Sequence, residues 1–435
     1  MTDTHHCPAL LISAPASGQG KTTLVAALAR YHRQQGRRVR VFKTGPDFLD
    51  PKIHQQASGH PVYQLDTWLV GEAQCRQLLY EAAASADLIL VEGVMGLFDG
   101  TPSSADLALS FGLPVAAVID ARAMAQTFGA IATGLAGYRP ELQFAGVVAN
   151  RVASEHHQNM LRDSLPAHIP WLGAVPRSDQ IELPERHLGL HQPDSISGFD
   201  NRLDAAAELI AATPLAQLPA AVPFTPAPAA TATDKLLQGQ RIAVARDAAF
   251  SFVYPANLQL LQQLGAELVD FSPLSDPELP PCDSLYLPGG YPELELDPLA
   301  DNSAMHASIQ QHHARGKPIV AECGGMLYLL QALTASDGRC RQMVGLIPAA
   351  AAMQPKLAGL GSQAVQFAAG ELRGHTFHYS AFNTAPPMTL HAVRHPYGTQ
   401  GEGVYQQAGL TASYLHWYLP SNPPLAAALF QGEAQ

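Results

Sequence analysis

One cysteine stands between two apolar stretches in the segment GKPIVAECGGMLYLL, residues 316–330. The first stretch predicts a buried strand and the second a helix, which places Cys323 at the turn, followed by Gly324 and Gly325. A helix N-terminus lowers the pKa of a thiol, and its N–H groups can bind an oxyanion. This arrangement is that of a nucleophile elbow and predicts a catalytic thiol, with a buried packing cysteine as the alternative.

A catalytic thiol also needs a second oxyanion donor and a general base. The segment PGGY, residues 288–291, follows a neighbouring predicted strand, so Gly290 and Gly324 are the candidate oxyanion donors. Several histidines in this half of the chain could serve as the base: His375, His378, His391, His395 and His416. Residue types and spacing do not choose among them.

A second chemical signal lies near the start of the chain, where PASGQGKTT, residues 15–23, joins a predicted strand to a predicted helix. It departs from the Walker A pattern at one position, because Pro15 replaces the first glycine. The glycines let backbone N–H groups turn toward phosphates, the lysine adds a positive charge and a threonine hydroxyl can bind Mg²⁺. A glycine-rich turn with a surface lysine is the alternative. We predict an ATP site made by Ser17, Gly18, Gln19, Gly20, Lys21, Thr22 and Thr23.

Carboxylates for the metal of a nucleotide site follow two other predicted strands. Asp47 and Asp50 come after RVRVFKT, and Glu92 ends DLILVEG. Because ligands of open α/β sheets bind at the strand ends, we expect Thr22, Asp47 and Glu92 to hold Mg²⁺. Asp50 is expected to contact the substrate or a second metal. Lys43 is a candidate phosphate or carboxylate contact; helix caps, turn aspartates and a solvated lysine are the alternatives.

Short apolar runs alternate with amphipathic segments in both halves of the chain, which is typical of α/β folds. The strands are apolar along their whole length, as in parallel sheets covered on both faces. Residues 213–234 are rich in proline and alanine and predict a linker. We therefore expect two doubly wound domains, residues 1–212 and 239–435, joined by a linker at 213–238.

Composition limits the classes of partner. The 435 residues carry a net charge of −11, and no cluster of Lys and Arg forms a basic stripe, which disfavours nucleic acid. No apolar run reaches the roughly 18 residues needed to span a bilayer, and the first residues lack the pattern of a signal peptide. The five cysteines are scattered. We expect a cytoplasmic protein with reduced thiols.

The chain resembles the cobyrinate and hydrogenobyrinate a,c-diamide synthases of cobalamin biosynthesis, almost from end to end. The stretches that carry the resemblance are APASGQGKTT, KTGPDFLDP, VEGVMGLFDG, RHLGL, RDAAFSFVYPANL, LPGGYPELE, AECGGMLYL and SYLHWY. Together they are highly specific. Taken singly, only the phosphate loop and the cysteine elbow are informative.

The resemblance implies an N-terminal domain like dethiobiotin synthetase and a C-terminal glutamine amidotransferase domain of the class I type. In the first, ATP and Mg²⁺ convert a carboxylate of a tetrapyrrole, a corrinoid acid, into an acyl phosphate. In the second, Cys323 is the nucleophile, His416 is its base and glutamine supplies ammonia. The implied products carry amides on side chains a and c. A homodimer is compatible with the resemblance.

The chain differs from the usual class I triad, which has a glutamate two residues after the histidine. Tyr418 stands at that position. The resemblance implies that the cobalamin branch of the family lacks this glutamate, so its absence does not indicate an inactive site. We expect a weakly primed glutaminase that works when the synthetase site is occupied. Two further departures, Thr376 where the family reads glutamate and the stretch around Gly361, leave open the role of that region in domain contact or substrate docking.

Two other functions compete with the a,c-diamide synthase. A cobyric acid synthase amidates other corrin carboxylates, but GPDFLDP and EGVMGLFDG favour the first interpretation. A partition ATPase of the deviant Walker type has a second lysine early in its phosphate loop, and residues 15–19 contain none. The sequence is compatible with an acceptor ring that contains cobalt and with one that does not.

Overall fold

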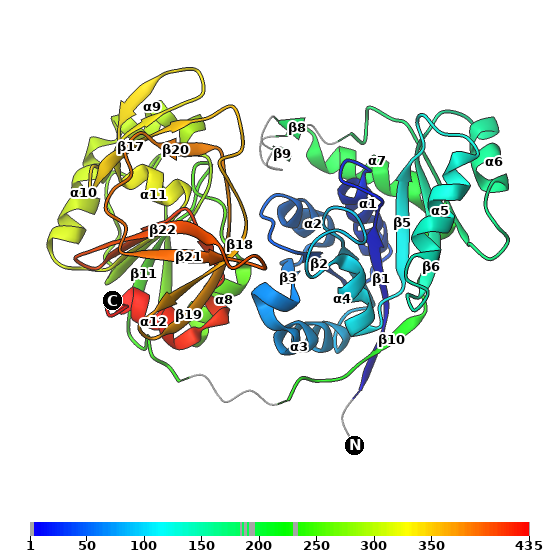
Figure 1. Ribbon diagram of the computed structural model, residues 1–435, viewed down its shortest axis with the longest axis horizontal. Helices are drawn as coiled ribbons and strands as arrows, with labels where there is room; N and C mark the ends of the chain where they lie inside the picture. The colour runs from blue at the N-terminus through cyan, green and yellow to red at the C-terminus, as the bar shows by residue number, and fades with distance from the viewer. Residues whose placement is uncertain (1–3, 183–184, 187–188, 191–195, 229–233, 435) are drawn as a thin grey trace. The chain divides into compact units, whose positions relative to one another are not determined.

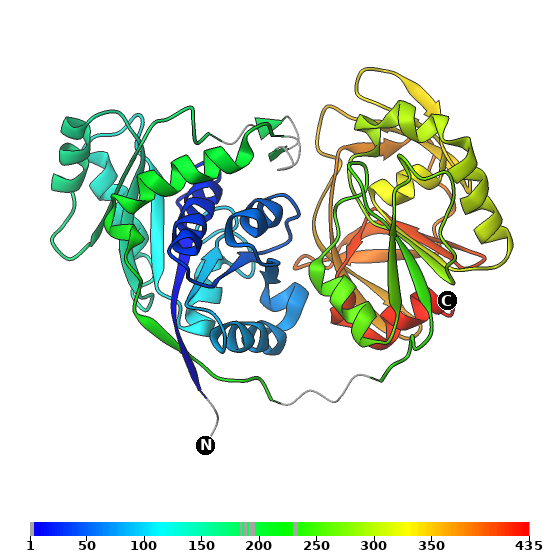
Figure 2. The same cartoon turned by 180° about the vertical axis from the view of Figure 1, so that it is seen from behind.

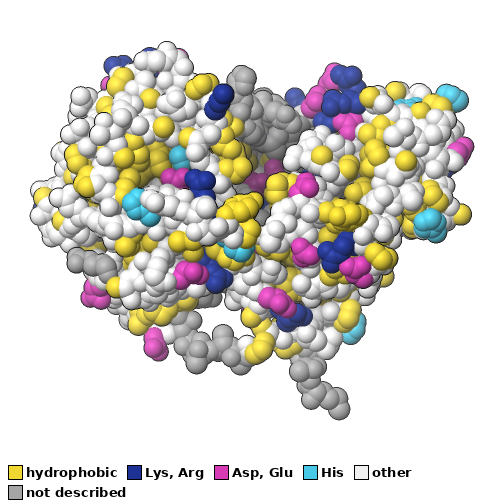
Figure 3. All heavy atoms as spheres, in the orientation of Figure 1, with side chains coloured by type: hydrophobic (Ala, Val, Ile, Leu, Met, Phe, Trp, Pro, Cys, Tyr) yellow, Lys and Arg dark blue, Asp and Glu magenta, His cyan; other side chains and the backbone are white. Residues whose placement is uncertain are grey.

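The computed structural model describes residues 4–182, 185–186, 189–190, 196–228 and 234–434 (Figure 1). The chain divides into two compact units, residues 1–230 and 231–435. None of the helices within these described ranges is both long and apolar enough to cross a bilayer. On the face shown in Figure 3, Lys and Arg side chains of the described residues lie scattered among acidic ones, without a continuous basic patch.

The first unit is built on a parallel sheet in the order β3-β2-β4-β1-β5-β6-β7. All five residues of β4 are buried, including Glu92 at its end, because helices cover both faces of the sheet (Figure 1). This confirms the predicted α/β fold with a parallel sheet. The strands are β1 His5–Ser13, β2 Val39–Thr44, β3 Tyr63–Leu65, β4 Leu88–Glu92, β5 Val115–Asp120, β6 Phe144–Val152, β7 Trp171–Pro176 and the small pair β8 Glu185–Arg186 and β9 Gly189–Leu190. The helices are α1 Lys21–Gln34, α2 Asp50–Ser58, α3 Glu72–Ala83, α4 Ser104–Phe111, α5 Thr127–Gly137, α6 Glu155–Asp163 and α7 Phe199–Ala211, with a π-helical turn at Thr67–Gly71.

The predicted linker is only partly a linker. Within it, a 3-10 turn forms at Pro214–Ala216, and β10, Ala221–Phe224, pairs antiparallel with the first residues of β1. Alternate side chains of β10 are buried, so this stretch belongs to the first unit. Proline is tolerated there because β10 pairs with β1 and lies off the main sheet path. Residues 229–233 lie outside the described residues.

The second unit combines a parallel half with an antiparallel half in one sheet, in the order β12-β11-β13-β14-β23-β22-β21-β18-β19-β24. The parallel half confirms the predicted strands, and its green strands β11–β13 are seen best from behind (Figure 2). The strands are β11 Arg241–Ala245, β12 Glu267–Phe271, β13 Ser284–Leu287, β14 Ile319–Glu322, β18 Gly359–Phe367, β19 Gly370–His378, β21 Leu390–Arg394, β22 Gln400–Gln407, β23 Leu410–Ser413 and β24 His416–Trp417.

A small second sheet in the order β16-β15-β17-β20 lies in the same unit. Its strands are β15 Leu330–Thr334, β16 Cys340–Gln342, β17 Ile347–Met353 and β20 Ser380–Phe382. The helices of the unit are α8 Pro255–Gln263, α9 Leu296–Asp301, α10 Ser303–Ala314, α11 Gly324–Leu329 and α12 Pro423–Gln431, with 3-10 turns at Pro292–Leu294 and Leu419–Ser421. The helix predicted after Cys323 is thus only six residues long, because the apolar run continues into β15.

Candidate active sites

The phosphate loop joins β1 to α1 as predicted. Gly18 and Gly20 have φ angles of 76° and 92°, a backbone region that favours glycine, and a Cβ on Gly20 would lie 2.2 Å from the Asn150 amide nitrogen. Lys21 is buried and donates hydrogen bonds to the carbonyl oxygens of Ala16 at 3.1 Å and Met95 at 2.6 Å. Burial lowers the pKa of Lys21 to about 8. The ammonium therefore lies over the loop, held by two carbonyl groups that a phosphate can replace.

Residues of the neighbouring strands β5 and β6 also form hydrogen bonds with the phosphate loop. Asn150, near the end of β6, donates to the carbonyl of Gln19 at 2.9 Å, and the Gln19 side chain accepts from the Asp120 N–H at 2.8 Å. Arg151 donates to the Gly18 carbonyl at 2.9 Å and to Asp120 at 2.7 Å. These contacts fix the loop before any nucleotide binds.

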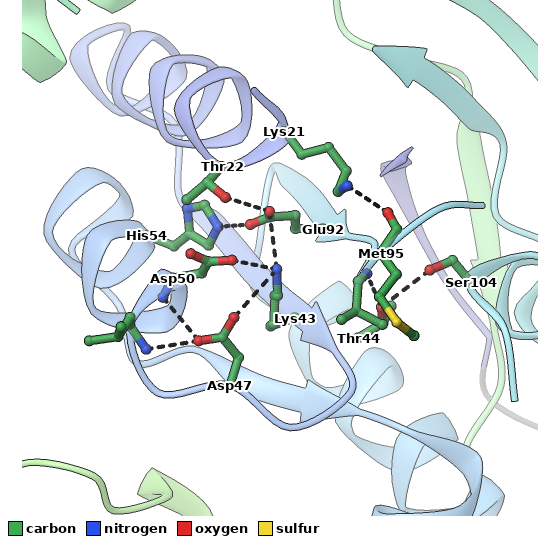
Figure 4. A network of polar contacts seen from close by, with 12 residues as sticks. Lys21, Thr22, Lys43, Thr44, Asp47, Asp50, His54, Glu92, Met95 and Ser104 are labelled. Carbon is green, nitrogen blue, oxygen red and sulfur yellow. Dashed lines mark hydrogen bonds and ion pairs between the residues drawn. The ribbon is translucent and has the colours of Figure 1, made fainter. Parts of the chain in front are cut away.

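A buried lysine lies among three carboxylates at the ends of β2 and β4 (Figure 4). The Lys43 ammonium is 2.6 Å from Asp50, 3.1 Å from Glu92 and 3.7 Å from Asp47, and the side chain is only 3% exposed. Burial alone would lower the pKa of Lys43, but the three carboxylates outweigh it and raise the pKa. Lys43 is therefore a charged member of the site, and the alternative of a solvated lysine is wrong.

Glu92 receives two further partners in the same place. Thr22 Oγ1 donates to one carboxylate oxygen at 2.8 Å, and the His54 Nε2 contacts the other (Figure 4). Burial would raise the pKa of Glu92, but Lys43 and His54 outweigh it and hold the pKa well below its usual range. Glu92 is thus ionised and joins the phosphate loop to the carboxylate cluster.

The two aspartates of this cluster differ in their surroundings. Asp47 Oδ1 accepts from the N–H groups of Leu49 at 2.8 Å and Asp50 at 3.2 Å, so it also orders the turn into α2. Burial, with the neighbouring charge of Asp50, raises the pKa of Asp47 to about 8. Asp50 begins α2 and points its carboxylate at Lys43. The structure therefore brings together Thr22, Lys43, Asp47, Asp50 and Glu92, as predicted.

The oxygen donors of this cluster suit Mg²⁺ chemically. Among the described residues, no group of three or more His, Cys, Asp or Glu side chains is arranged to hold a metal by itself. Mg²⁺ in nucleotide sites commonly takes one or two protein oxygens and completes its shell with phosphates and water. The hydrogen-bonded pair of Thr22 and Glu92 beside the loop fits that pattern.

The cysteine of the second unit lies at a strained turn between β14 and α11. Cys323 has φ 42° and ψ −105°, and its N–H donates to the Ser413 carbonyl at 2.7 Å. A Cβ on Gly324 would lie 2.9 Å from the Gly290 nitrogen, and one on Gly325 would lie 2.1 Å from the Leu287 carbonyl oxygen. Glycine is needed at both positions for this close approach, which brings the two predicted oxyanion donors, Gly290 and Gly324, together.

Of the five candidate histidines, His416 lies against the elbow. A Cβ on Gly289 would lie 2.2 Å from its Cε1 atom, and its Nδ1 is 4.0 Å from Glu322, the residue before Cys323. The His375 ring stacks on it with centroids 5.1 Å apart, and Tyr254 Oη lies 2.8 Å from the His375 Nδ1. These contacts favour His416 as the base of the thiol.

Comparison with known proteins accounts for both units. Residues 10–190 match the CobQ/CobB/MinD/ParA nucleotide binding domain, and residues 241–424 match the CobB/CobQ-like glutamine amidotransferase domain. A hydrogenobyrinate a,c-diamide synthase from Stutzerimonas stutzeri is 59% identical over 98% of this chain and 99% of its own. This chain belongs to the a,c-diamide synthase family.

Other relatives in the a,c-diamide synthase family agree. A hydrogenobyrinate a,c-diamide synthase from Pseudomonas aeruginosa is 58% identical over 97% of each chain. A cobyrinate a,c-diamide synthase from Herminiimonas arsenicoxydans is 50% identical over 99% of this chain and 98% of its own. The resemblance stated from the sequence is confirmed, and this family member is an amide-forming, glutamine-dependent ligase.

The electrostatics of the glutaminase site differ from the expectation drawn from the elbow. Burial, together with the nearby carboxylate of Glu293, raises the pKa of the Cys323 thiol, although a helix N-terminus was expected to lower it. The short α11 and a thiol only 6% exposed explain the difference, because removal from water dominates. Burial and the neighbouring histidines lower the pKa of His416 well below its usual value. At rest, both groups are neutral.

Thr376 stands where the resemblance led us to expect a glutamate, and a carboxylate from another strand lies beside it. Thr376 Oγ1 donates to Glu402 of β22 at 3.4 Å, and His378 Nε2 lies 3.1 Å from the same carboxylate oxygen. His378 stacks on Tyr414 with centroids 3.7 Å apart. A carboxylate from another strand therefore lies beside Thr376.

The sequence interpretation missed several residues of both sites. His54 stands four residues after Asp50, a spacing that places both on one face of α2. Asn150 and Arg151 lie near the end of an apolar strand, where ligands of such sheets bind. Glu322 precedes the nucleophile within a buried strand, and its polarity there was a signal in itself.

Proposed function

We propose that this chain amidates the a and c side-chain carboxylates of hydrogenobyrinate, with ATP·Mg²⁺ and glutamine as co-substrates, in cobalamin biosynthesis. The observation that carries the proposal is the buried cluster of Lys43, Asp50 and Glu92 beside the phosphate loop. This cluster supplies a buried cation and oxygen ligands for Mg²⁺, both of which ATP-dependent activation of a carboxylate can use. The choice of the metal-free ring is supported by the names of the relatives at 59% and 58% identity, whereas the cobyrinate enzyme is 50% identical.

In the synthetase unit, residues 17–23 bind the triphosphate, and Lys21 moves from its two carbonyl partners to the phosphates. Thr22, Asp47 and Glu92 would hold Mg²⁺, which supplies charge neutralisation at the phosphates. Lys43 and Asp50 orient the acceptor carboxylate. An oxygen of that carboxylate attacks the γ-phosphorus, ADP leaves, and an acyl phosphate forms.

In the glutaminase unit, His416 takes the proton of the Cys323 thiol as the sulfur attacks the amide carbon of glutamine. The backbone N–H groups of Gly290 and Gly324 stabilise the oxyanion. The same proton passes to the departing nitrogen, ammonia is released, and water hydrolyses the thioester to glutamate. Ammonia then attacks the acyl phosphate, the amide forms and phosphate leaves. The neutral resting state of the thiol and its base supports slow glutamine turnover until the synthetase site is filled.

The test offers hydrogenobyrinate or cobyrinate to the purified protein with ATP and glutamine, and counts the amides by mass spectrometry. We expect two amides on hydrogenobyrinate. Cys323→Ser should abolish the use of glutamine and preserve the use of free ammonia. A protein that amidates neither ring with ammonia, or a Cys323→Ser variant that loses both activities, would contradict the proposal.

Two further features belong to the same proposal. We place the reaction in the cytoplasm, which the scattered, unpaired cysteines of the described residues support. The homodimer stays a prediction, and light scattering of the purified protein checks it.

A further inference from the structure

Glu322 ends β14, directly before the nucleophile, and is only 1% exposed. One carboxylate oxygen, Oε1, accepts from Tyr286 Oη at 2.9 Å and from the Trp417 N–H at 3.2 Å. The other oxygen, Oε2, lies 4.0 Å from Nδ1 of His416. A buried acid thus sits behind the ring of the base, with one oxygen engaged by two donors and the other directed at the imidazole.

A histidine base works only if a third group holds it in the correct tautomer, with the proton on the nitrogen that faces away from the nucleophile. Tyr418, two residues after His416, carries no carboxylate, and its ring packs edge-on against Tyr254. The carboxylate of Glu322, by contrast, lies 4.0 Å from Nδ1 of His416.

We propose that Glu322 is the positioning residue of the glutaminase site. The inference rests on the proposed function, because it assigns His416 as the base of Cys323. Burial raises the pKa of the Glu322 carboxyl above its usual value, while the hydrogen bonds from Tyr286 and the Trp417 N–H favour the carboxylate form. As a carboxylate, Glu322 accepts the Nδ1–H of His416 through Oε2, and Nε2 takes the thiol proton. The separation of 4.0 Å is longer than a hydrogen bond, and catalytic hydrogen bonds commonly tighten when substrate binds.

The proton balance of the step is simple. The Sγ–H bond of Cys323 breaks, an Nε2–H bond forms on His416, and the electron pair stays on sulfur for attack on the amide carbon. The Nδ1 proton stays on the imidazolium. Glu322 balances the new positive charge, which would be costly to form in a buried site without a partner.

The alternative is a scaffold role, in which Glu322 only ties β24 to β13 and β14 through Trp417 and Tyr286. Glu322→Gln separates the two roles. The glutamine oxygen can still accept from both donors, so the scaffold survives. Its NH₂ group, however, would face Nδ1 and donate to it, which selects the tautomer with a proton on Nε2 and removes the base.

The experiment measures glutamate release and the alkylation of Cys323 by a diazo-ketone analogue of glutamine, with ATP and acceptor present. For Glu322→Gln we expect kcat with glutamine to fall by about 10²–10⁴-fold, KM for glutamine to change little, and alkylation to slow in parallel. Ammonia-dependent amidation should be unchanged. Glu371→Gln, an exposed carboxylate paired with Arg373 on β19, is the matched control and should match the wild type.

A second measurement uses a His416→Ala background, in which Glu322→Gln should cause no further loss if Glu322 acts through the imidazole. The proposal is overturned by a Glu322→Gln variant within threefold of wild-type kcat, by an equal further loss in the His416→Ala background, or by a variant that no longer folds, since Gln keeps both scaffold hydrogen bonds. Failure of the proposed function looks different, because wild-type protein would then lack ammonia-dependent amidation.

Discussion

Lys43 and Asp50 form a buried ion pair, with the ammonium 2.6 Å from a carboxylate oxygen at the end of β2. Glu92 lies 3.1 Å and Asp47 3.7 Å from the same nitrogen. Because the Lys43 ammonium balances the charge of buried carboxylates, its removal affects both the stability of the first unit and the chemistry of the site.

The variant Lys43→Gln should therefore destabilise the first unit by about 3–5 kcal/mol, because it leaves buried carboxylates without their cation. Urea unfolding of the full chain measures this loss, and added ATP·Mg²⁺ should restore part of it by binding the folded state. The control is Arg162→Gln, which removes an exposed ion pair with Asp163 and should cost less than about 1 kcal/mol. Equal effects of the two variants would show that Lys43 is not a buried counter-charge.

The contact between His54 and Glu92 leads to a prediction about Mg²⁺. His54→Ala removes the side chain that orients the carboxylate, and such losses typically weaken metal binding about 10–100-fold. The concentration of Mg²⁺ needed for ADP release, and for the thermal shift caused by ATP, should both rise. His60→Ala, on the loop after α2, serves as the control. An unchanged Mg²⁺ requirement in His54→Ala would remove His54 from the site.

The raised pKa of Cys323 predicts low reactivity at rest. Iodoacetamide at neutral pH should modify the exposed Cys340 well before Cys323, because a buried thiol with a raised pKa holds its proton. Peptide mass mapping over a time course measures the order. Faster modification of Cys323 than of Cys340 in protein without substrates would mean that the thiolate forms at rest.

The same neutral resting site predicts coupling between the two reactions. Glutamine hydrolysis without ATP and acceptor should be slower than in the complete mixture, and glutamate release in the two mixtures measures the ratio. Cys340→Ser should show the same ratio as the wild type. Equally fast hydrolysis in both mixtures would contradict a glutaminase that waits for the synthetase site.

A buried histidine predicts the response of the second unit to acid. Burial lowers the pKa of His375 to about 3, whereas an unfolded histidine has a pKa of about 6.5. Between these pH values the unfolded chain binds a proton at His375 that the folded chain does not bind. The free energy of unfolding therefore falls as pH falls, by about 2 kcal/mol between pH 7 and pH 5.

His375→Gln should remove that part of the pH dependence while keeping an acceptor for Tyr254. Urea unfolding at the two pH values measures it, followed by the fluorescence of the buried Trp417 in a background with Trp68→Phe and Trp171→Phe. An unchanged slope with pH in His375→Gln would show that His375 binds protons equally in the folded and the unfolded chain.

The sequence by itself determined the local features. The apolar runs before residues 15–23 and before Cys323 predicted parallel strands, and the glycines after them predicted turns of unusual backbone conformation, which the structure confirms at Gly20 and Cys323. These features depend on neighbours in the chain, so pattern and residue type suffice. The family resemblance extended them to His416, which spacing alone could not choose.

Tertiary structure decided the contacts between distant segments. It surrounded Lys43 with acids from a strand, a turn and a helix, placed Glu322 behind His416, brought Glu402 to Thr376, and paired part of the predicted linker with β1. It also reversed the expected shift of the Cys323 pKa, because burial outweighs a short helix. Hydrophobic periodicity reports which face of an element is covered, but not which strand becomes its neighbour. Strand order and burial therefore determine which charged groups become neighbours in these sites and in which direction their pKa values shift.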